Sequence, residues 1–429
     1  MKIAILTQYY PPEVGAPQAR WSALAREFAR RGHAVTVLTA MPSYPTGRIP
    51  PGYGGFVRRE EQDGVSVIRT LIYPTQNPGF ARRLANYFSF VLSSAAVGTA
   101  CLGSPDYIFV ESPPLLLGLT GLWLSWLTRA RMVFNVSDLW PESAVRLGIL
   151  RAGSITHRLS EWLEGVCYRH AWLVTGQSGE IVTDISARFP DCRTFHLSNG
   201  VDIEAFGPEQ ATSASSGLLG GSRSCVALYA GLHGLAQGLD QLLDGAAGLP
   251  SECDLDVVLM GDGPQKSKLV ERARAQRIAR IRFVDSRPHR EMPAILAAGD
   301  ILIVPLFRHL PGAVPSKLYE AMASARPVVL VAEGEATRIV TEHRAGIVVH
   351  PQDRAGLVNA LRMLSANPTL RNQLGTNGRA AAVEHFDRTR IVGDFVTFLE
   401  GQTPARPSGT PARALRVPRP PRDVKRAVS

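Results

Sequence analysis

The chain alternates short β-branched apolar runs with amphipathic helical stretches, and it does so in two separate series. The first series extends from the run at 3–7 to the run at 194–197, and the second extends from 226–230 to 347–349. Strands that alternate with helices form parallel sheets with right-handed crossovers. The sequence therefore predicts an α/β protein with two Rossmann-like domains, whose parallel sheets face a central cleft.

Length and composition agree with two folded domains. A chain of 429 residues is too long for one ordinary core, and 45% hydrophobic with 20% charged residues is typical of folded proteins. The five cysteines are scattered, which argues against disulfides and a zinc site and favours a reducing compartment. Residues 1–7 resemble a strand rather than a signal peptide, so we expect a cytoplasmic protein.

Domain boundaries follow from composition. We expect an N-terminal Rossmann-like domain at 1–205, joined by a C-terminal helix at about 385–400, and a second Rossmann-like domain at 206–384. The Gly/Ser-rich stretch 210–224 is predicted to be a loop or linker. The Pro/Arg-rich tail 401–429 carries a net charge of +6 and is predicted to be disordered. It could contact anionic lipid headgroups or simply aid solubility.

Two apolar segments, 84–103 and 113–127, are expected to be crossover helices rather than membrane spans. The second is too short to span a bilayer, and polar residues such as Asn86 and Ser93 interrupt the first. Arg82 and Arg83 beside Tyr87, Phe88 and Phe90 also fit a helix resting on a bilayer surface, or a buried crossover with a solvated basic end.

The stretch 314–324 predicts an anion site. Ser316 is expected to cap a helix, and Lys317 lies in its first turn, where unpaired N–H groups gather. A helix start with a cation suits a diphosphate, and Glu320, one turn further on, could accept hydrogen bonds from a ribose. Together these residues indicate a nucleoside diphosphate.

Other candidate residues follow strands. Gly15 opens the first helix, and Gly231, Gly261 and Gly263 follow strands of the second series, where backbone can approach a ligand closely. Plain turns would explain the glycines of the second series equally well, and a proline-stiffened connection is the alternative for the loop of Gly15. Asp138 should emerge at the carboxyl end of the strand at 131–136, where it could bind a substrate or cap the next helix. The first loop is not a GxGxxG fingerprint, which argues against a nicotinamide cofactor.

The chain resembles the retaining glycosyltransferases of the GT-B fold, family 4, from residue 1 to about 400. More narrowly it is similar to the bacterial O-antigen, capsule and colanic-acid branch, of the L-fucosamine transferase type. The motifs that carry the resemblance are QYYPPEVGAP (8–17), MPSYPTG (41–47), DLWPE (138–142), SNGVD (198–202), YAG (229–231), QG (237–238), GDGP (261–264), PSKLYE (315–320) and GTNGR (375–379).

The resemblance implies transfer of a sugar, with retention, from a nucleotide diphosphate. The donor would be a UDP-sugar by default, although GDP is possible. The acceptor would be a polyprenyl-diphosphate-linked sugar or a glycan, and the product a cell-surface polysaccharide such as lipopolysaccharide. The enzyme would work without metal or cofactor at the inner face of the plasma membrane, with no nucleic-acid partner.

Specific residues are assigned by this resemblance together with the patterns above. The predicted catalytic residues are Asp138, Lys317 and Glu320. The predicted donor-binding residues are Gly15, Gly231, Gln237, Gly261, Gly263, Arg287, Ser316 and Leu318. The predicted acceptor-binding residues are Glu13, Arg20 and Glu142.

Two departures from the family pattern concern charge. Gly312 stands where the wider family has an acidic residue, and Leu232 and Leu235 occupy the loop that usually carries a basic pair. Lys317, helped by Arg287 or Arg308, would then hold the leaving diphosphate. Asp254-Leu-Asp256 lies where a strand begins, at the wrong edge of the sheet for a metal-bound nucleotide.

Two other functions fit parts of the sequence. A UDP-N-acetylglucosamine 2-epimerase shares the fold, although the apolar segment 84–103 and the long loop 41–64 speak against it. A non-catalytic scaffold at the membrane surface would explain the missing basic pair.

Overall fold

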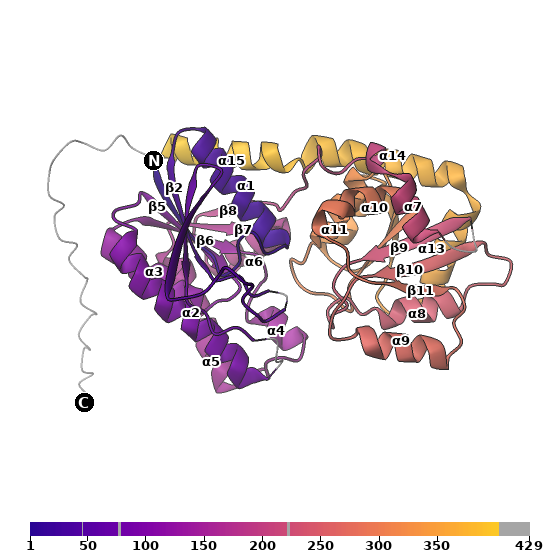
Figure 1. Ribbon diagram of the computed structural model, residues 1–429, viewed down its shortest axis with the longest axis horizontal. Coiled ribbons are helices and arrows are strands. Elements are labelled where there is room, and N and C mark those ends of the chain that lie inside the picture. Colours follow the sequence, from indigo (N-terminus) through magenta and orange to yellow (C-terminus); the bar gives the residue numbers. More distant parts are fainter. Residues whose placement is uncertain (45, 76–78, 221–223, 403–429) are drawn as a thin grey trace, which may run out of the picture.

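Each half of the protein is built around its own β-sheet, in agreement with the predicted α/β class (Figure 1). The computed structural model describes residues 1–44, 46–75, 79–220 and 224–402. Of the predicted tail, only Gly401 and Gln402 lie within these ranges, at the end of the last helix.

The first sheet has the strand order β3-β4-β2-β1-β5-β6-β7-β8, with β1 and β5 side by side at its centre. Its strands are β1 (Lys2–Leu6), β2 (Ala34–Ala40), β3 (Val57–Gln62), β4 (Val65–Thr70), β5 (Tyr107–Ser112), β6 (Arg131–Val136), β7 (Leu173–Gly176) and β8 (Thr194–His196). The helices of this half are α1 (Ala16–Arg30), α2 (Phe80–Cys101), α3 (Leu117–Thr128), α4 (Glu142–Arg146), α5 (Ile155–His170) and α6 (Gly179–Arg188).

The second sheet is wholly parallel, in the order β11-β10-β9-β12-β13-β14. Its strands are β9 (Cys225–Ala230), β10 (Leu255–Met260), β11 (Ile281–Val284), β12 (Ile301–Pro305), β13 (Val328–Val331) and β14 (Gly346–Val349). The remaining helices are η1 (Pro208–Gln210), α7 (Ser213–Leu219), α8 (Asp240–Ala247), α9 (Lys266–Ala275), η2 (His289–Glu291), α10 (Met292–Ala298), α11 (Ser316–Ala323), α12 (Glu335–Glu342), α13 (Arg354–Ala366), α14 (Pro368–His385) and α15 (Arg388–Gln402).

One strand lies where the sequence predicted only a loop. Residues 41–64 include β3, which pairs antiparallel with β4 at the edge of the first sheet. The strand VRREEQ has no apolar alternation, so its pattern gave no signal. Its charges are satisfied by pairing instead, since Glu60 accepts a hydrogen bond of 2.6 Å from the buried Arg69 of β4.

The predicted linker 210–224 is also wrong in part, because it contains the helix α7. Thr212 and Ser215 form a reciprocal capping box that offsets the poor helix propensity of the segment. Leu219 is buried in the core of the second domain. Val201 and Phe206 lie in the same core, so the chain joins the second domain a few residues before the predicted boundary at 205.

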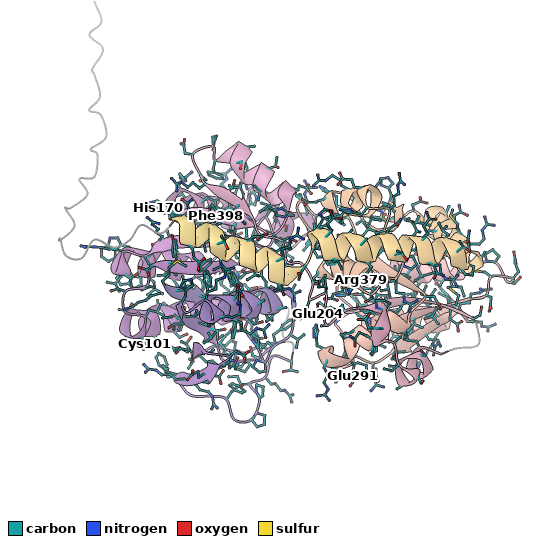
Figure 2. All side chains as sticks on the ribbon, turned by 90° about the horizontal axis from the view of Figure 1, so that it is seen from above. Cys101, His170, Glu204, Glu291, Arg379 and Phe398 are labelled. Atoms are coloured by element: carbon teal, nitrogen blue, oxygen red, sulfur yellow. The ribbon has the colours of Figure 1, made fainter. Side chains whose placement is uncertain are left out.

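The chain crosses between the domains twice, and the two crossings are joined. Val201 N–H donates to Phe386 O at 2.8 Å, and Arg388 N–H donates to Val201 O at 2.9 Å. Beyond this junction α15 lies along the first domain, while α14 covers the second (Figure 2). The last helix thus returns to the N-terminal domain.

Helix α2 is long and apolar enough to cross a membrane by length and composition, over Arg82–Cys101. One side of it packs against the first sheet, where Phe90 and Val97 are buried. Ser93 Oγ, also buried, lies 3.0 Å from Thr70 Oγ1 at the end of β4. These contacts are those of a crossover helix that covers a sheet.

The place of α15 in the first domain can be tested with Phe395→Ala. Phe395 is fully buried, with ring centroids 6.1 Å from Phe109 and 5.0 Å from Phe195. We expect the free energy of unfolding to fall by about 3–5 kcal/mol, as for other buried Phe→Ala changes. Thermal and urea unfolding would measure it. The exposed neighbour provides the control, because Asp394→Ala should change stability by less than about 0.5 kcal/mol.

Candidate functional site

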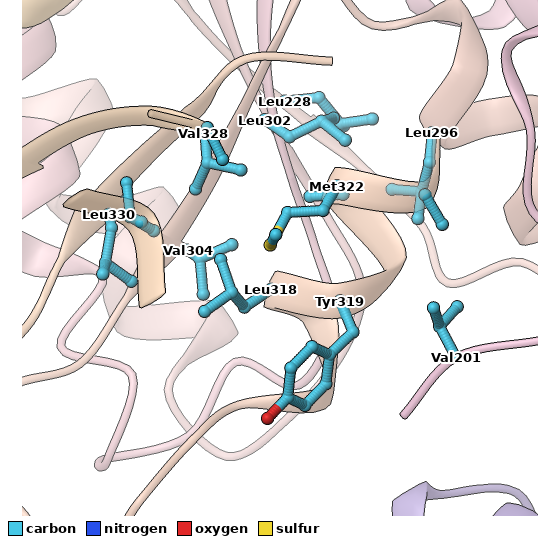
Figure 3. Close-up of a cluster of buried hydrophobic side chains, with 14 of the residues drawn as sticks. Val201, Leu228, Leu296, Leu302, Val304, Leu318, Tyr319, Met322, Val328 and Leu330 are labelled. Carbon is cyan, nitrogen blue, oxygen red and sulfur yellow. The ribbon is translucent and has the colours of Figure 1, made fainter. Parts of the chain in front are cut away.

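Helix α11 begins after β12 at the carboxyl edge of the second sheet, and its buried side packs into the core of the second domain. Leu318, Tyr319 and Met322 are buried in the core of the second domain (Figure 3). The predicted cap is off by one residue, since Pro315 is the N-cap and Ser316 is the first helical residue. The N–H of Leu318, which was predicted to bind the donor, donates instead to Pro315 O at 2.9 Å. The N–H groups of Ser316 and Lys317 remain as candidates for this contact.

Lys317 extends across Gly231, which lies just after β9. A Cβ atom on Gly231 would overlap Cε of Lys317 and lie 2.5 Å from its Nζ. Gly231 has φ +154°, a conformation that side chains rarely adopt. Burial lowers the pKa of Lys317, and the charge of Glu320 acts in the opposite direction. The Lys317 amine therefore lies against the backbone of Gly231, near the start of α11.

The three predicted glycines form one layer of closely packed backbone. A Cβ on Gly261 would overlap the carbonyl of Gly231, and one on Gly263 would lie 2.6 Å from the carbonyl of His233. The His233 side chain is fully buried beside this layer, and burial lowers its pKa, so the imidazole is neutral at pH 7. Because these residues have no Cβ, the loops that follow β9 and β10 pack backbone against backbone.

Glu320 lies one turn after Lys317, as the sequence predicted. Both side chains line a small pocket together with Ala230 and Met292. Arg388, at the start of α15, interacts electrostatically with Glu320, although burial lowers the pKa of this guanidinium. The Glu320 carboxylate therefore lies near the Arg388 guanidinium and near Ala230 at the end of β9.

The other side chains that the sequence assigned to the donor do not line this pocket. Gln237 folds back toward Gly234, and its buried Oε1 accepts no hydrogen bond within the described structure. Arg287 is exposed after β11. Arg308 reaches the first domain, where it donates to Arg146 O at 3.1 Å, so it is engaged between the domains.

Across the cleft, Asp138 follows β6 beside a buried polar network that the sequence did not reveal. Glu111, at the end of β5, is 1% exposed and accepts four kinds of donor. These are Arg20 Nη2 at 3.0 and 3.1 Å, Trp21 Nε1 at 2.7 Å, Asn135 Nδ2 at 2.8 Å and Ser137 Oγ at 2.6 Å. Burial and the nearby Glu111 charge raise the pKa of Asp138 to about 7.

Arg20 was predicted to bind the acceptor, and the structure corrects this assignment. Its side chain is 1% exposed, and besides Glu111 it donates to Ser137 Oγ at 2.7 Å and to Asn199 Oδ1. Asn199 belongs to the crossing segment, and its carbonyl accepts from Arg388 Nε at 2.9 Å. Arg20 therefore positions the segment between the domains. The sequence signal for this network was Glu111, a charged residue near the end of the apolar strand β5.

The predicted acceptor residues Glu13 and Glu142 differ in their surroundings. Glu13 is buried, and its Oε1 accepts from Ser43 N–H and Tyr44 N–H at 2.8 Å each, so it ties two loops together. Burial raises the pKa of Glu13, against the effect of these N–H groups. Glu142 is exposed and pairs with Arg146 at 2.7 Å. Neither has a contact that tests its predicted role.

Gly15 is the N-cap of α1, as predicted. Its φ of 168° is ordinary extended backbone, so left-handed geometry is not the reason for this glycine. A Cβ there would approach the Gln18 side chain at 2.5 Å.

The unusual Gly312 is explained by contact between the domains. With φ +71°, it lies so close to α6 that a Cβ would overlap Cγ1 of Ile181. An acidic side chain would not fit here. Nearby, the Glu335 carboxylate of α12 accepts Gly179 N–H at 2.9 Å and Glu180 N–H at 2.6 Å, and so clasps the start of α6.

The described residues contain no group of three or more His, Cys, Asp or Glu that could hold a metal ion. Asp254 precedes β10 and accepts Ser224 N–H at 3.2 Å. The Asp-x-Asp thus lies at the amino edge of the second sheet, opposite the glycine layer.

The comparisons with known proteins agree with this architecture. Residues 15–200 match the family "Glycosyl transferase 4-like domain", and residues 224–367 match "Glycosyl transferases group 1". The protein is a glycosyltransferase with the GT-B fold.

Among its relatives is the protein named "Putative colanic acid biosynthesis glycosyl transferase WcaI" of Escherichia coli (strain K12). It is 23% identical over 414 residues, which cover 94% of this chain and 100% of the relative. Sucrose-phosphate synthase from Thermosynechococcus elongatus has a similar fold, with a TM-score of 0.75 and 18% identity over 94% of this chain and 98% of its own. Anabaena HepE in complex with UDP-glucose has a TM-score of 0.68 and 19% identity over 94% of this chain and 100% of its own.

The contact between Gly231 and Lys317 gives a direct test of the glycosyltransferase site. In Gly231→Ala the new methyl group displaces the lysine, so we expect affinity for UDP to fall by about tenfold, the order of a lost charge-assisted contact. Titration calorimetry would measure it. Gly217→Ala in α7 is the control, since no atom lies within 4 Å of a Cβ there. Equal UDP affinity in both variants would contradict a donor site at this place.

The raised pKa of Asp138 predicts how stability depends on pH. The folded state holds a proton that the unfolded state releases, so this contribution to stability is full below the ordinary pKa of 3.8 and is lost as the pH rises through about 7. Asp138→Asn should therefore gain stability relative to wild type between about pH 5 and about pH 8. Melting temperatures at both pH values would show it, with Glu142→Gln, an exposed carboxylate, as the control. A constant difference across this range would rule out a buried, protonated Asp138.

Proposed function

We propose that this glycosyltransferase moves a sugar from a UDP-sugar to a polyprenyl-diphosphate-linked or glycan acceptor, with retention of anomeric configuration. The product would be a cell-surface polysaccharide, in the L-fucosamine transferase-like branch of the family. The observation that carries the proposal is Lys317 lying over Gly231 at the start of α11, one turn from Glu320. The relative WcaI, named for colanic acid biosynthesis, and the HepE complex with UDP-glucose support the pathway and the donor.

The leaving diphosphate would be stabilised from the second domain. Its charge would meet the Lys317 ammonium and the N–H groups of Ser316 and Lys317, fixed dipoles at a helix N-terminus. Glu320 would accept hydrogen bonds from the ribose hydroxyls. The glycine layer at Gly231 and Gly261 would let the nucleotide approach the strand ends closely.

The bond changes need no carboxylate nucleophile. The bond from the anomeric carbon to the phosphate oxygen breaks, and a bond from that carbon to the acceptor oxygen forms on the same face. The acceptor proton passes to the departing phosphate oxygen. We propose that this occurs without metal or cofactor.

Asp138 would act from the first domain, facing the donor across the cleft. Its pKa of about 7 leaves the carboxyl partly protonated at neutral pH, so it can donate or accept a hydrogen bond to a sugar hydroxyl. The Arg20–Glu111 network beneath it keeps this edge of the sheet in place. Closure of the domains would exclude water and limit hydrolysis of the donor.

Lys317→Ala tests the role of the diphosphate site in transfer. We expect kcat/KM for sugar transfer from UDP-sugars to fall by about 10²–10³, the size of losing one group that stabilises developing charge. Lys268→Ala, an exposed lysine of α9, is the matched control and should keep full activity. Product linkages analysed by NMR should have the anomeric configuration of the donor.

The same assay separates transfer from the alternative of 2-epimerisation. Incubation with the UDP-sugar alone should leave the sugar unchanged except for slow hydrolysis. Formation of an epimer without any acceptor would disprove the proposed transfer reaction. If a UDP-sugar binds the Lys317→Ala variant and the wild type with equal affinity, Lys317 does not hold the diphosphate.

A further inference from the structure

Three helices of the first domain present a continuous row of exposed apolar side chains. Helix α3 packs between α2 and α5, on one side of the first sheet (Figure 1). We call their outward surface the Trp face, and it consists of Phe88, Leu92, Leu119, Trp123, Trp126, Leu127, Ile155, Leu159 and Trp162. Nine of the twenty exposed large apolar residues in the described chain therefore belong to these three helices.

The spacing shows that these side chains are not core residues left partly open. On α5, Ile155, Leu159 and Trp162 recur at helical intervals and are 79%, 59% and 61% exposed. The C-terminal half of the same helix, with Leu163 and Cys167, packs in the core. The N-terminal half of α5 thus carries an apolar stripe that no other part of the described chain covers.

Two tryptophans of α3 combine exposed apolar rings with a polar N–H group. Trp126 is 73% exposed, and its ring lies 5.4 Å from that of Trp123. Trp123 Nε1 donates to Thr99 Oγ1 at 3.0 Å and so links α3 to α2. Indole side chains, with an apolar body and one N–H, are typical of the boundary between hydrocarbon and water.

Positive charge surrounds this surface. Exposed arginines lie at the start of α2, after α3, and before and within α5 (Arg82, Arg129, Arg151 and Arg158), whereas Glu161 is the acidic residue exposed on α5. The last described residue, Gln402, accepts a hydrogen bond of 2.8 Å from Arg131, two positions after Arg129. Residues 403–429, which follow Gln402 in the sequence, carry a net charge of +6.

We propose that the Trp face docks on a bilayer surface that contains anionic lipids. Exposed indoles and aliphatic side chains would enter the headgroup boundary, while the surrounding arginines contact lipid phosphates. Of the α2 aromatic residues that the sequence placed beside a bilayer, Phe88 belongs to the Trp face, whereas Phe90 is fully buried, so contact falls mainly on α3 and α5. The inference does not depend on which sugar or acceptor the enzyme uses.

The orientation has a consequence for the cleft. Helices α2 and α3 follow β4 and β5 and therefore begin at the carboxyl edge of the first sheet, where Asp138 lies. The Trp face thus extends from the rim of the cleft toward the opposite edge. A membrane-bound acceptor could reach the first domain along this surface.

Flotation with phospholipid vesicles tests the proposal on the full chain. We expect binding to vesicles of phosphatidylcholine with phosphatidylglycerol, much weaker binding to phosphatidylcholine alone, and a decrease with added salt. The double variant Trp126→Ser/Trp162→Ser should lower vesicle affinity by about tenfold or more, as expected for losing buried indole area. Met363→Ser, 51% exposed on α13 of the second domain, is the control and should bind as wild type.

Other outcomes would overturn the proposal. Unchanged vesicle binding in the double variant would do so, as would binding that disappears on truncation after Gln402 but is insensitive to the tryptophans. If sedimentation shows instead that the double variant converts a dimer to a monomer, the Trp face joins two copies of the chain. Transfer to a soluble acceptor is measured in parallel, so failure of docking and failure of the proposed reaction are distinguishable.

Discussion

The first domain depends on a charge pair that has been removed from water. Arg20 of α1 and Glu111 of β5 are both about 1% exposed, and a buried pair of this kind is stable only when its remaining donors and acceptors are satisfied. Trp21, Asn135 and Ser137 supply the missing hydrogen bonds to the carboxylate. Loss of one partner would leave an uncompensated buried charge, which typically costs about 3–5 kcal/mol.

This pair connects local packing with the relation of the two domains. Through Asn199 it reaches the first crossing segment, and Arg388 holds the carbonyls of Asn199 and Gly200 from the second. Arg388 is also near Glu320 of the candidate donor site. The first domain, the junction and the start of α11 are therefore parts of one polar system, in which Asp138 and Lys317 occupy opposite ends.

Much of this architecture could be predicted because it depends on local pattern. Strands such as Val328–Val331 are continuous apolar runs and helices such as α1 are amphipathic, and the two sheets follow from their alternation along the chain. The strand β3 and helix α7 could not be predicted, since pairing with β4 and burial of Leu219 determine them. The sequence placed Gly231 after a strand and Lys317 in the first turn of a helix, but it could not show that the Lys317 side chain crosses the Gly231 backbone. The burial of Arg20 was equally hidden, because its partner lies ninety-one positions away.

The clasp between Glu335 and the start of α6 affects how easily the domains separate. When they part, the carboxylate exchanges two backbone N–H groups for water. The separated state therefore takes up solvent at this contact. Excluded osmolytes, which disfavour hydration of newly exposed surface, would shift the protein toward the closed arrangement without any change in its charges.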